Sequence, residues 1–325
     1  MKSREWIAQQ IATPDKRAVP CLFYPAIAES GLTTHQALTD AGAQAEILVG
    51  IAERYPVAAL VRMSELWCEA AAFGAECVFE DRTFPRVNGV LASDAEELLD
   101  LTIPDPVNSV TEPMLAAIEK AAKTAGVPVF AGVTGPYTLG SVLGGSEDFM
   151  VNCLTEPEAV QEFLDRLSRF LVDYIGKYKQ AGAAGVMVAE PSVGMISPDM
   201  AEDFSNRYLR DIIAAVQDDG FSVIYHNCGN VGPHLRGLAT LGAHAYHIGD
   251  AVDMAGALEA FPRDALVMGN IHPDKFALAA AATMERDTAE LKGKFSGYPN
   301  FVLSSGCDIG PNAKRENLEA FFAVA

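Results

Sequence analysis

The sequence predicts a single α/β domain of the (β/α)8 TIM-barrel class, and three observations lead to this prediction. The chain has 325 residues, half of them hydrophobic, which is enough for one large core. Short apolar runs alternate with longer amphipathic stretches, as they do in a barrel of parallel strands and covering helices. No phosphate-binding glycine fingerprint follows the first run, which removes the main reason to prefer an open doubly wound sheet.

The apolar runs are nearly continuous rather than alternating, as expected for strands that are buried on both faces. They cover residues 18–25, 57–63, 127–133, 184–191, 222–229, 243–250, 265–271 and 301–307. Residues 76–91 could form either a further strand or a hairpin, and the sequence does not decide between the two. A helical pattern over residues 197–219 begins with Ser197 as a cap candidate and with Pro198 at the first helical position. We predict one domain over residues 1–325, with residues 1–17 packed across the bottom or side of the barrel.

The charge of the chain argues against two classes of partner. The formal net charge is −19, from 43 acidic and 24 basic residues. Such a field repels phosphate backbones and anionic membrane surfaces. The N-terminus is charged in every turn and lacks the apolar stretch of a signal peptide, and no apolar run approaches the length of a bilayer span. We therefore predict a cytoplasmic protein with reduced thiols that binds neither nucleic acid nor membranes.

Residues at the carboxyl ends of barrel strands carry function, and these ends are rich in metal ligands. His226 and Cys228 end the fifth run, and residues two apart on a strand point to the same face, about 6–7 Å apart along it. Both side chains can therefore reach one zinc ion, although a core histidine beside a buried thiol is the alternative. Cys307 ends the last run and would complete a soft, zinc-preferring set with one open position. From the residues alone, Cys307 is equally well a ligand or a buried thiol.

Three further residues at strand ends are candidates for a role at this site. Glu190 is expected to act as a fourth zinc ligand or to orient one, with a solvated carboxylate at the rim as the alternative. His247 and Asp250 have odd spacing, so at most one of them faces the site. For Asp250 we expect a hydrogen bond that orients His226.

Two loops supply candidates for binding the substrate or cofactor. Residues 134–145 are rich in glycine without forming a known nucleotide fingerprint, and Tyr137 and Thr138 within them are expected to line the substrate mouth. Asn230, just after the His-x-Cys pair, is expected to cap the next helix or to bind the substrate.

Motifs along nearly the whole chain resemble one family. The likeness rests on HNCGN (226–230), GNIHP (269–273) and SSGCDIGPNAKRENLEAFFAV (304–324), with further likeness over residues 68–87, 132–145 and 181–198. These stretches resemble the zinc-dependent corrinoid methyltransferases of the uroporphyrinogen decarboxylase superfamily, which include methylcobamide:coenzyme M methyltransferases and corrinoid-linked demethylases. The resemblance implies a TIM barrel and a zinc site made by a His-x-Cys pair and a distant Cys. Those positions are His226, Cys228 and Cys307.

The resemblance also implies an activity and its partners. It implies methyl transfer between a corrinoid (methylcobalamin or a methylated corrinoid protein) and a small thiol or methylated substrate, with zinc activating the nucleophile. A separate corrinoid carrier protein is the expected partner. A sulfonate substrate such as coenzyme M would need a cation near the zinc, for which Arg62 and Arg207 are candidates.

Two alternative functions remain open at this point. One is a metal-free lyase of the decarboxylase branch, which holds its acidic tetrapyrrole with an arginine-rich N-terminal motif. Residues 24–33, the corresponding region here, contain no arginine, and a site without cations receives carboxylates poorly. The other is a non-catalytic protein that binds a corrinoid or tetrapyrrole.

Overall fold

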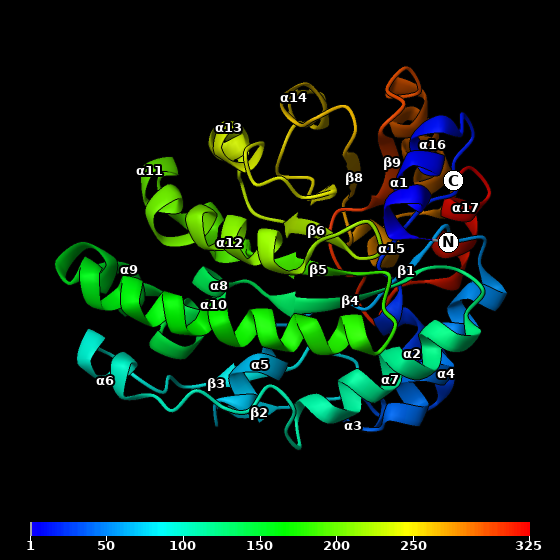
Figure 1. The fold of residues 1–325 in the computed structure, drawn as a ribbon. Helices are drawn as coiled ribbons and strands as arrows, with labels where there is room; N and C mark the ends of the chain where they lie inside the picture. The colour runs from blue at the N-terminus through cyan, green and yellow to red at the C-terminus, as the bar shows by residue number, and fades with distance from the viewer. Residues whose placement is uncertain (1) are drawn as a thin grey trace.

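The computed structural model describes residues 2–325 and contains a curled parallel sheet with helices around it (Figure 1). Seven strands form this sheet in the order β1-β4-β5-β6-β7-β8-β9, and every neighbouring pair is parallel. They are β1 (Leu60–Val61), β4 (Val129–Thr134), β5 (Gly185–Ala189), β6 (Ser222–Asn227), β7 (Ala245–Ile248), β8 (Leu266–Ile271) and β9 (Phe301–Ser305). The carboxyl ends of these strands therefore lie at one mouth, as the sequence predicts for a TIM-barrel-like α/β fold.

The first predicted strand, residues 18–25, is wrong, and the sheet is not a closed eight-stranded barrel. Helix α2 (Phe23–Ser30) begins inside this run. Before it, the Val19 N–H donates to β9 and the Ala18 carbonyl accepts from the residue two before β1, each at 3.0 Å. The segment thus lies between the two edge strands. Pro20 has no N–H and cannot continue a ladder of hydrogen bonds, so no eighth strand forms there.

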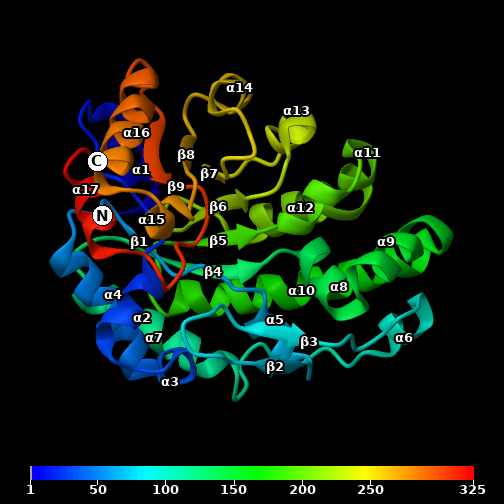
Figure 2. The ribbon, with the colours of Figure 1, turned by 180° about the vertical axis from the view of Figure 1, so that it is seen from behind.

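A separate antiparallel hairpin accounts for the stretch that the sequence left open. It consists of β2 (Glu76–Val78) and β3 (Arg86–Asn88) and contacts α5 (Trp67–Ala72), away from the parallel sheet (Figure 2). Of the two alternatives for this stretch, the hairpin is confirmed and the additional strand in the main sheet is wrong.

Helices of ten or more residues pack around the sheet. They are α1 (Ser3–Ala12), α4 (Ala41–Arg54), α7 (Thr111–Thr124), α9 (Ser146–Thr155), α10 (Pro157–Gln180), α12 (Arg207–Val216) and α16 (Ala281–Lys294). The shorter helices are α3 (Thr34–Thr39), α6 (Ala95–Asp100), α8 (Pro136–Gly144), α11 (Pro198–Ala201), α13 (Leu235–Leu238), α14 (Met254–Ala260), α15 (Lys275–Leu278) and α17 (Arg315–Phe322). Two 3-10 turns, η1 (Pro191–Met195) and η3 (Gly232–His234), and a π-helical turn, η2 (Glu202–Asn206), complete the set.

The helix predicted over residues 197–219 is confirmed, with a π turn in its middle. The Ser197 hydroxyl accepts a hydrogen bond from the Met200 N–H at 3.2 Å and caps α11, as the sequence predicts. From there α11, η2 and α12 continue to Val216.

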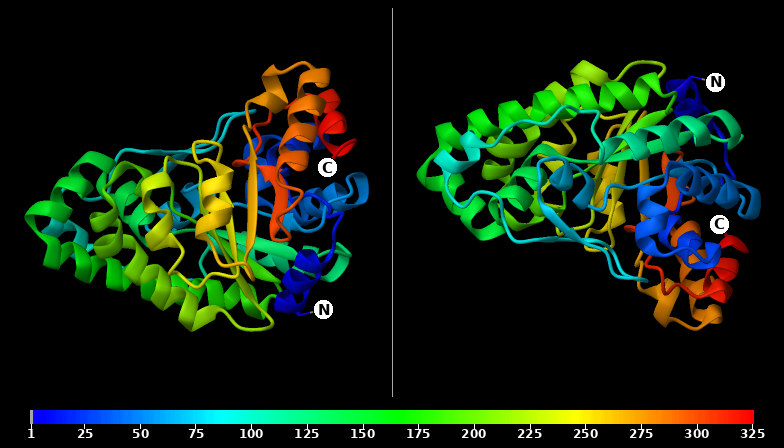
Figure 3. Two further views of the ribbon diagram at one scale, coloured as in Figure 1. Left: turned by 90° about the horizontal axis from the view of Figure 1, so that it is seen from above. Right: turned by 90° about the horizontal axis from the view of Figure 1, so that it is seen from below.

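Helix α1 closes the amino-terminal end of the sheet. Trp6 lies in one apolar cluster with side chains from the interior of the sheet, and its ring is 5.5 Å from that of Phe130. The N–H of Arg4 donates to the Asp219 carbonyl, just before β6 begins. The two chain ends lie on the same side of the molecule (Figure 3). The N-terminal segment thus packs across the bottom of the sheet and leaves the opposite mouth to the strand ends that carry the candidate ligands.

Two structural findings concern the environment of the protein. Within residues 2–325, no helix combines the length and the apolar character that crossing a bilayer requires. All six cysteines are free thiols.

Candidate functional site

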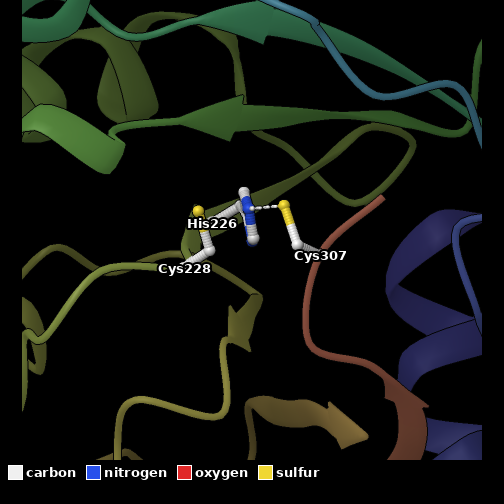
Figure 4. A group of neighbouring side chains, drawn as sticks. All are labelled: His226, Cys228 and Cys307. Carbon is white, nitrogen blue, oxygen red and sulfur yellow. Dashed lines mark hydrogen bonds between the residues drawn. The ribbon is translucent and has the colours of Figure 1, made fainter. Parts of the chain in front are cut away.

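Three potential metal donors converge at the carboxyl ends of β6 and β9 (Figure 4). The donor atoms of His226, Cys228 and Cys307 all lie within 4.8 Å of one another, and His226 Nε2 is 3.6 Å from Cys307 Sγ. A tetrahedral zinc ion with bonds of about 2.0–2.3 Å needs nitrogen–sulfur separations of about 3.5 Å. The spacing and the one-nitrogen, two-sulfur chemistry of these residues therefore fit a zinc ion.

The two thiols of this triad influence each other's ionisation. The hydrogen bond from the Cys307 thiol, aided by contact with His226, lowers the pKa of Cys228 to about 4 against the effect of burial. The same contact with Cys228, together with burial, raises the pKa of Cys307 well above its usual range. The pair therefore holds one thiolate and one thiol, a favourable starting state for a metal that binds thiolates.

A chain of hydrogen bonds fixes the orientation and tautomer of His226. The Ser304 hydroxyl donates to the Val19 carbonyl at 2.6 Å, so its oxygen accepts from His247 Nε2–H at 2.9 Å. His226 Nδ1–H then has two acceptors on His247, the ring Nδ1 at 2.7 Å and the backbone carbonyl at 3.1 Å. Burial and the neighbouring His226 hold the pKa of His247 well below its usual range, so this ring is neutral. The chain leaves the lone pair of His226 Nε2 facing the two thiols.

The partner of His226 is therefore His247, and the expected hydrogen bond from Asp250 to His226 is wrong. Asp250 is exposed and lies 3.7 Å from His272 Nε2 instead. The signal for His247 was present in the sequence, because β6 and β7 each contain a Tyr-His pair. These pairs are aligned in the sheet, with His226 opposite His247. Aligned positions on neighbouring parallel strands lie side by side, which the odd spacing of residues 247 and 250 does not reveal.

We predict that replacing His247 with leucine lowers zinc affinity by about tenfold, the lower end of the range for loss of a partner behind a metal-binding histidine, because the backbone carbonyl of residue 247 still accepts from His226. His247→Asn should restore most of this affinity, because its side-chain oxygen can accept the His226 Nδ1–H. Competition with a chromogenic chelator measures both affinities. An unchanged affinity in His247→Leu would show that the chain of hydrogen bonds does not act on the metal site.

The triad opens into a cavity of about 410 Å³ at the mouth of the sheet. Met63, Ser64, Glu65, Leu66, Phe84, Pro273 and Asp308 also line it. Most of these residues follow β1 and β9, the two edges of the curled sheet. The cavity therefore offers space beside the donors for a substrate.

The two arginines considered as cations for an anionic substrate lie in different places. Arg62 is buried, and its guanidinium pairs with the Glu65 carboxylate at the cavity wall. Arg207 is exposed on α12, where its guanidinium lies over the ring of Tyr208, and it does not line the cavity. Sequence reasoning did not identify Glu65 as the partner of Arg62.

Glu190 is buried beneath the site and is neither a rim carboxylate nor a member of the donor triad. Its carboxylate accepts hydrogen bonds from the backbone N–H groups of Tyr137 and Thr138, at 3.0 and 2.8 Å, and from the Ser205 hydroxyl at 3.2 Å. It thereby caps the N-terminus of α8. Gly135 permits this approach, because a Cβ there would lie 2.4 Å from Glu190 Cδ.

We predict a pH dependence of stability from this carboxyl group. Burial raises the pKa of Glu190 to about 7, against the hydrogen bonds it accepts. Because the folded state binds the proton more tightly, the free energy of unfolding should fall by about 3 kcal/mol as the pH rises from about 4.5 to 7. Urea unfolding at several pH values measures this drop. Glu190→Gln should remove the share that Glu190 contributes, whereas Glu69 and Asp308, whose pKa values burial also raises, keep theirs.

Glu202→Gln serves as the control for this pH dependence. The hydrogen bond from Arg210 lowers the pKa of Glu202, so Glu202 stabilises the fold less as the pH falls. Its contribution to the pH dependence therefore has the opposite sign to that of Glu190. A drop between pH 4.5 and 7 that is as large in Glu190→Gln as in the unmodified protein would contradict the assignment.

The remaining candidate binding residues do not line the cavity. Tyr137 and Thr138 are buried. The Tyr137 ring packs 5.5 Å from that of Phe149, and the Thr138 hydroxyl accepts from the Ser192 N–H. Asn230 is exposed on the loop before η3. The prediction that Tyr137 and Thr138 line the substrate mouth is therefore wrong. Their backbone N–H groups instead donate to Glu190.

Comparison with known proteins gives the family and the fold. Residues 21–325 match the family model of uroporphyrinogen decarboxylase (URO-D). Among curated relatives, the uroporphyrinogen decarboxylase of Dichelobacter nodosus (strain VCS1703A) is 26% identical over 276 residues, which cover 82% of this chain and 78% of that protein.

Solved structures share the architecture at low identity. A methyltransferase from Methanosarcina mazei has a TM-score of 0.84 and 22% identity, with 100% of this chain and 98% of that chain covered. A B12-independent methionine synthase from Shewanella sp. W3-18-1 has a TM-score of 0.58 and 15% identity, with 95% and 93% covered. Since the family model spans nearly the whole sequence, the chain belongs to the uroporphyrinogen decarboxylase family.

Proposed function

We propose that this protein is a methyltransferase that moves a methyl group between a corrinoid and a small thiol or methylated compound, with a zinc ion held by His226, Cys228 and Cys307. The observation that carries the proposal is the convergence of one imidazole and two thiols beside a cavity at the carboxyl ends of the strands. A set of three protein donors with space for a fourth is typical of catalytic rather than structural zinc. The fold likeness to the Methanosarcina mazei methyltransferase is consistent with this function.

Zinc, when bound, lowers the pKa of a thiol and so supplies a nucleophile near neutral pH. Methyl transfer to a thiol forms a sulfur–carbon bond and breaks the cobalt–carbon bond of methylcobalamin. The electron pair stays on cobalt as cob(I)alamin, and the thiol proton leaves to solvent. The protein's own residues have two tasks. His247 and Ser304 orient His226, and the cavity walls position the substrate against the triad.

The corrinoid and the cellular setting belong to the same proposal. We propose that the corrinoid is methylcobalamin or is carried by a separate protein that docks at the mouth. We also place the enzyme in the reducing cytoplasm, because the triad requires both thiols to remain unoxidised.

Decarboxylation of a tetrapyrrole is the second candidate, since the curated relatives are named uroporphyrinogen decarboxylase. The cavity is poorly suited to a substrate with many carboxylates, because Glu65 and Asp308 line it and the guanidinium of Arg62 is already paired. Decarboxylation also gives no role to the two converging thiols. A non-catalytic corrinoid- or tetrapyrrole-binding protein is the third candidate, and it has no need of a nucleophile site.

A spectroscopic assay separates these candidates. Zinc-loaded protein is mixed with methylcobalamin and a panel of thiols or aryl methyl ethers, and formation of cob(I)alamin is followed under anaerobic conditions. We expect cob(I)alamin only when a thiol is supplied, and the reverse transfer from a methylated compound to cob(I)alamin. Decarboxylation of uroporphyrinogen without any methyl transfer would establish the second candidate, and binding of the corrinoid without turnover would establish the third.

A further inference from the structure

Four polar side chains form a group beside the triad cavity, two of them on its wall and two behind it, and we call this group the polar recess: Glu65 and Asp308 on the wall, Arg62 and Tyr24 behind it. Glu65 and Asp308 line the same cavity as the three candidate metal donors. Arg62 pairs with Glu65, and the Tyr24 ring packs 4.5 Å from the ring of Phe84, another lining residue. Burial raises the pKa of the Tyr24 hydroxyl well above its usual range, and the charges of Glu65, Arg62 and Asp308 also act on it.

Three atoms of the polar recess lack a hydrogen-bond partner in the structure. They are Tyr24 Oη, Arg62 Nη2 and Asp308 Oδ1, on residues that are 0%, 3% and 9% exposed. Eight such buried side-chain atoms occur within residues 2–325, and among the residues that carry them Asp308 lines this cavity. Burying a polar atom without a partner costs about 1–3 kcal/mol. Three such costs beside a candidate metal site indicate that a ligand supplies the missing partners.

The charges of the recess decide what kind of ligand group fits. Arg62 contributes one positive charge and Glu65 one negative charge, and these two are paired. The net charge of the recess is therefore zero when Asp308 is protonated and −1 when it is ionised. It is not positive in either state. An anion buried here would meet no uncompensated cation. A neutral group that both donates and accepts hydrogen bonds can satisfy the free N–H of Arg62, the Tyr24 hydroxyl and the Asp308 oxygen.

We propose that the polar recess binds the head group of the substrate, and that this head group is a neutral carboxamide or hydroxyl rather than a sulfonate or carboxylate. The inference rests on the proposed function, because it takes the reacting sulfur or methyl group to lie at the triad. Asp308 directly follows Cys307, so a head group a few bonds from the reacting atom reaches the recess. In this proposal Arg62 does not bind a sulfonate, because Glu65 already neutralises its charge.

A matched pair of thiols tests this preference. The zinc-loaded full chain is titrated by calorimetry with 3-mercaptopropionamide and with 3-mercaptopropionate, which differ only in the head group. We expect the amide to bind at least about tenfold more tightly. Equal affinities, tighter binding of the carboxylate, or binding of neither thiol would overturn the proposal.

Two variants locate the effect in the recess. Glu65→Gln leaves the charge of Arg62 uncompensated, so the carboxylate thiol should gain about tenfold in affinity while the amide changes little. Tyr24→Phe removes one unpartnered hydroxyl without changing any charge and should weaken amide binding severalfold. Its matched control is Tyr246→Phe, because the Tyr246 hydroxyl on β7 is also buried without a partner but lies outside the cavity lining. An equal effect of the two phenylalanine variants would place the binding elsewhere.

The same samples separate this proposal from the proposed function. Methylcobalamin is added after each titration and cob(I)alamin is followed. A clear amide preference without cob(I)alamin would support the recess and overturn methyl transfer. Cob(I)alamin formed equally with both thiols would support methyl transfer and overturn the recess.

Discussion

Replacing Cys307 with serine should abolish the proposed zinc binding and, with it, the proposed methyl transfer. A serine hydroxyl does not ionise near neutral pH, so the variant offers one thiolate and one imidazole in place of the full triad. Loss of a direct donor should lower zinc affinity by more than the ~100-fold upper range of outer partners, and the rate of cob(I)alamin formation should fall by a similar factor. Metal analysis and the methylcobalamin assay on the same preparation check both effects.

The control for this prediction is another cysteine in a different environment. Cys77 is half-buried in the hairpin of β2 and β3, and its thiol contacts backbone carbonyls rather than metal donors. Cys77→Ser should keep both zinc and activity, whereas Cys228→Ser should behave like Cys307→Ser. A Cys307→Ser protein with full zinc content would exclude Cys307 as a ligand.

Replacing Gly249 with alanine should weaken the metal site without changing any ligand. Gly249 follows β7, and a Cβ at this position would lie 2.6 Å from Cys228 Cα and 2.9 Å from the Cys228 carbonyl oxygen. The Gly249 N–H donates to the Asn227 carbonyl at 2.9 Å, and the Gly249 carbonyl accepts from Asn270 Nδ2 at 3.1 Å. These bonds hold Gly249 in place, so the backbone of Cys228 has to move. We expect zinc affinity to fall by about 10–100-fold.

The matched control for Gly249→Ala is Gly256→Ala in α14. A Cβ at Gly256 would meet its nearest neighbour at 3.8 Å, an ordinary contact. This variant should bind zinc like the unmodified protein, as measured by chelator competition. If Gly249→Ala also binds zinc normally and melts at the same temperature, the close approach of Gly249 to Cys228 does not constrain the site.

Apolar runs predicted most of the fold because strands covered on both faces have a simple signature. Seven of the predicted runs coincide with the seven strands of the sheet, and β4 extends one residue beyond its run, to Thr134. The first run has the same composition, but Pro20 interrupts its hydrogen bonding and α2 begins at Phe23. Counting apolar residues gives no weight to this missing N–H, so the first strand was predicted wrongly and a full eight-stranded barrel is not confirmed.

The triad could be predicted because its residues lie at strand ends, where side-chain direction follows from strand geometry. Glu190 lies one residue beyond β5, where the backbone has left the extended region (φ −126°, ψ 51°), and the alternation of side chains no longer holds. Its carboxylate therefore points to the start of α8 rather than to the mouth. The polar recess joins residues 24, 62, 65 and 308, and only the folded chain brings these positions together.

If His226, Cys228 and Cys307 hold zinc, the metal content of the unmodified protein should reveal it. The protein is purified without added metal and its zinc is measured by mass spectrometry, with circular dichroism as a check of folding. We expect close to one zinc ion per chain, which a strong chelator removes and added zinc restores. A folded, zinc-free protein that takes up no zinc on titration would contradict it.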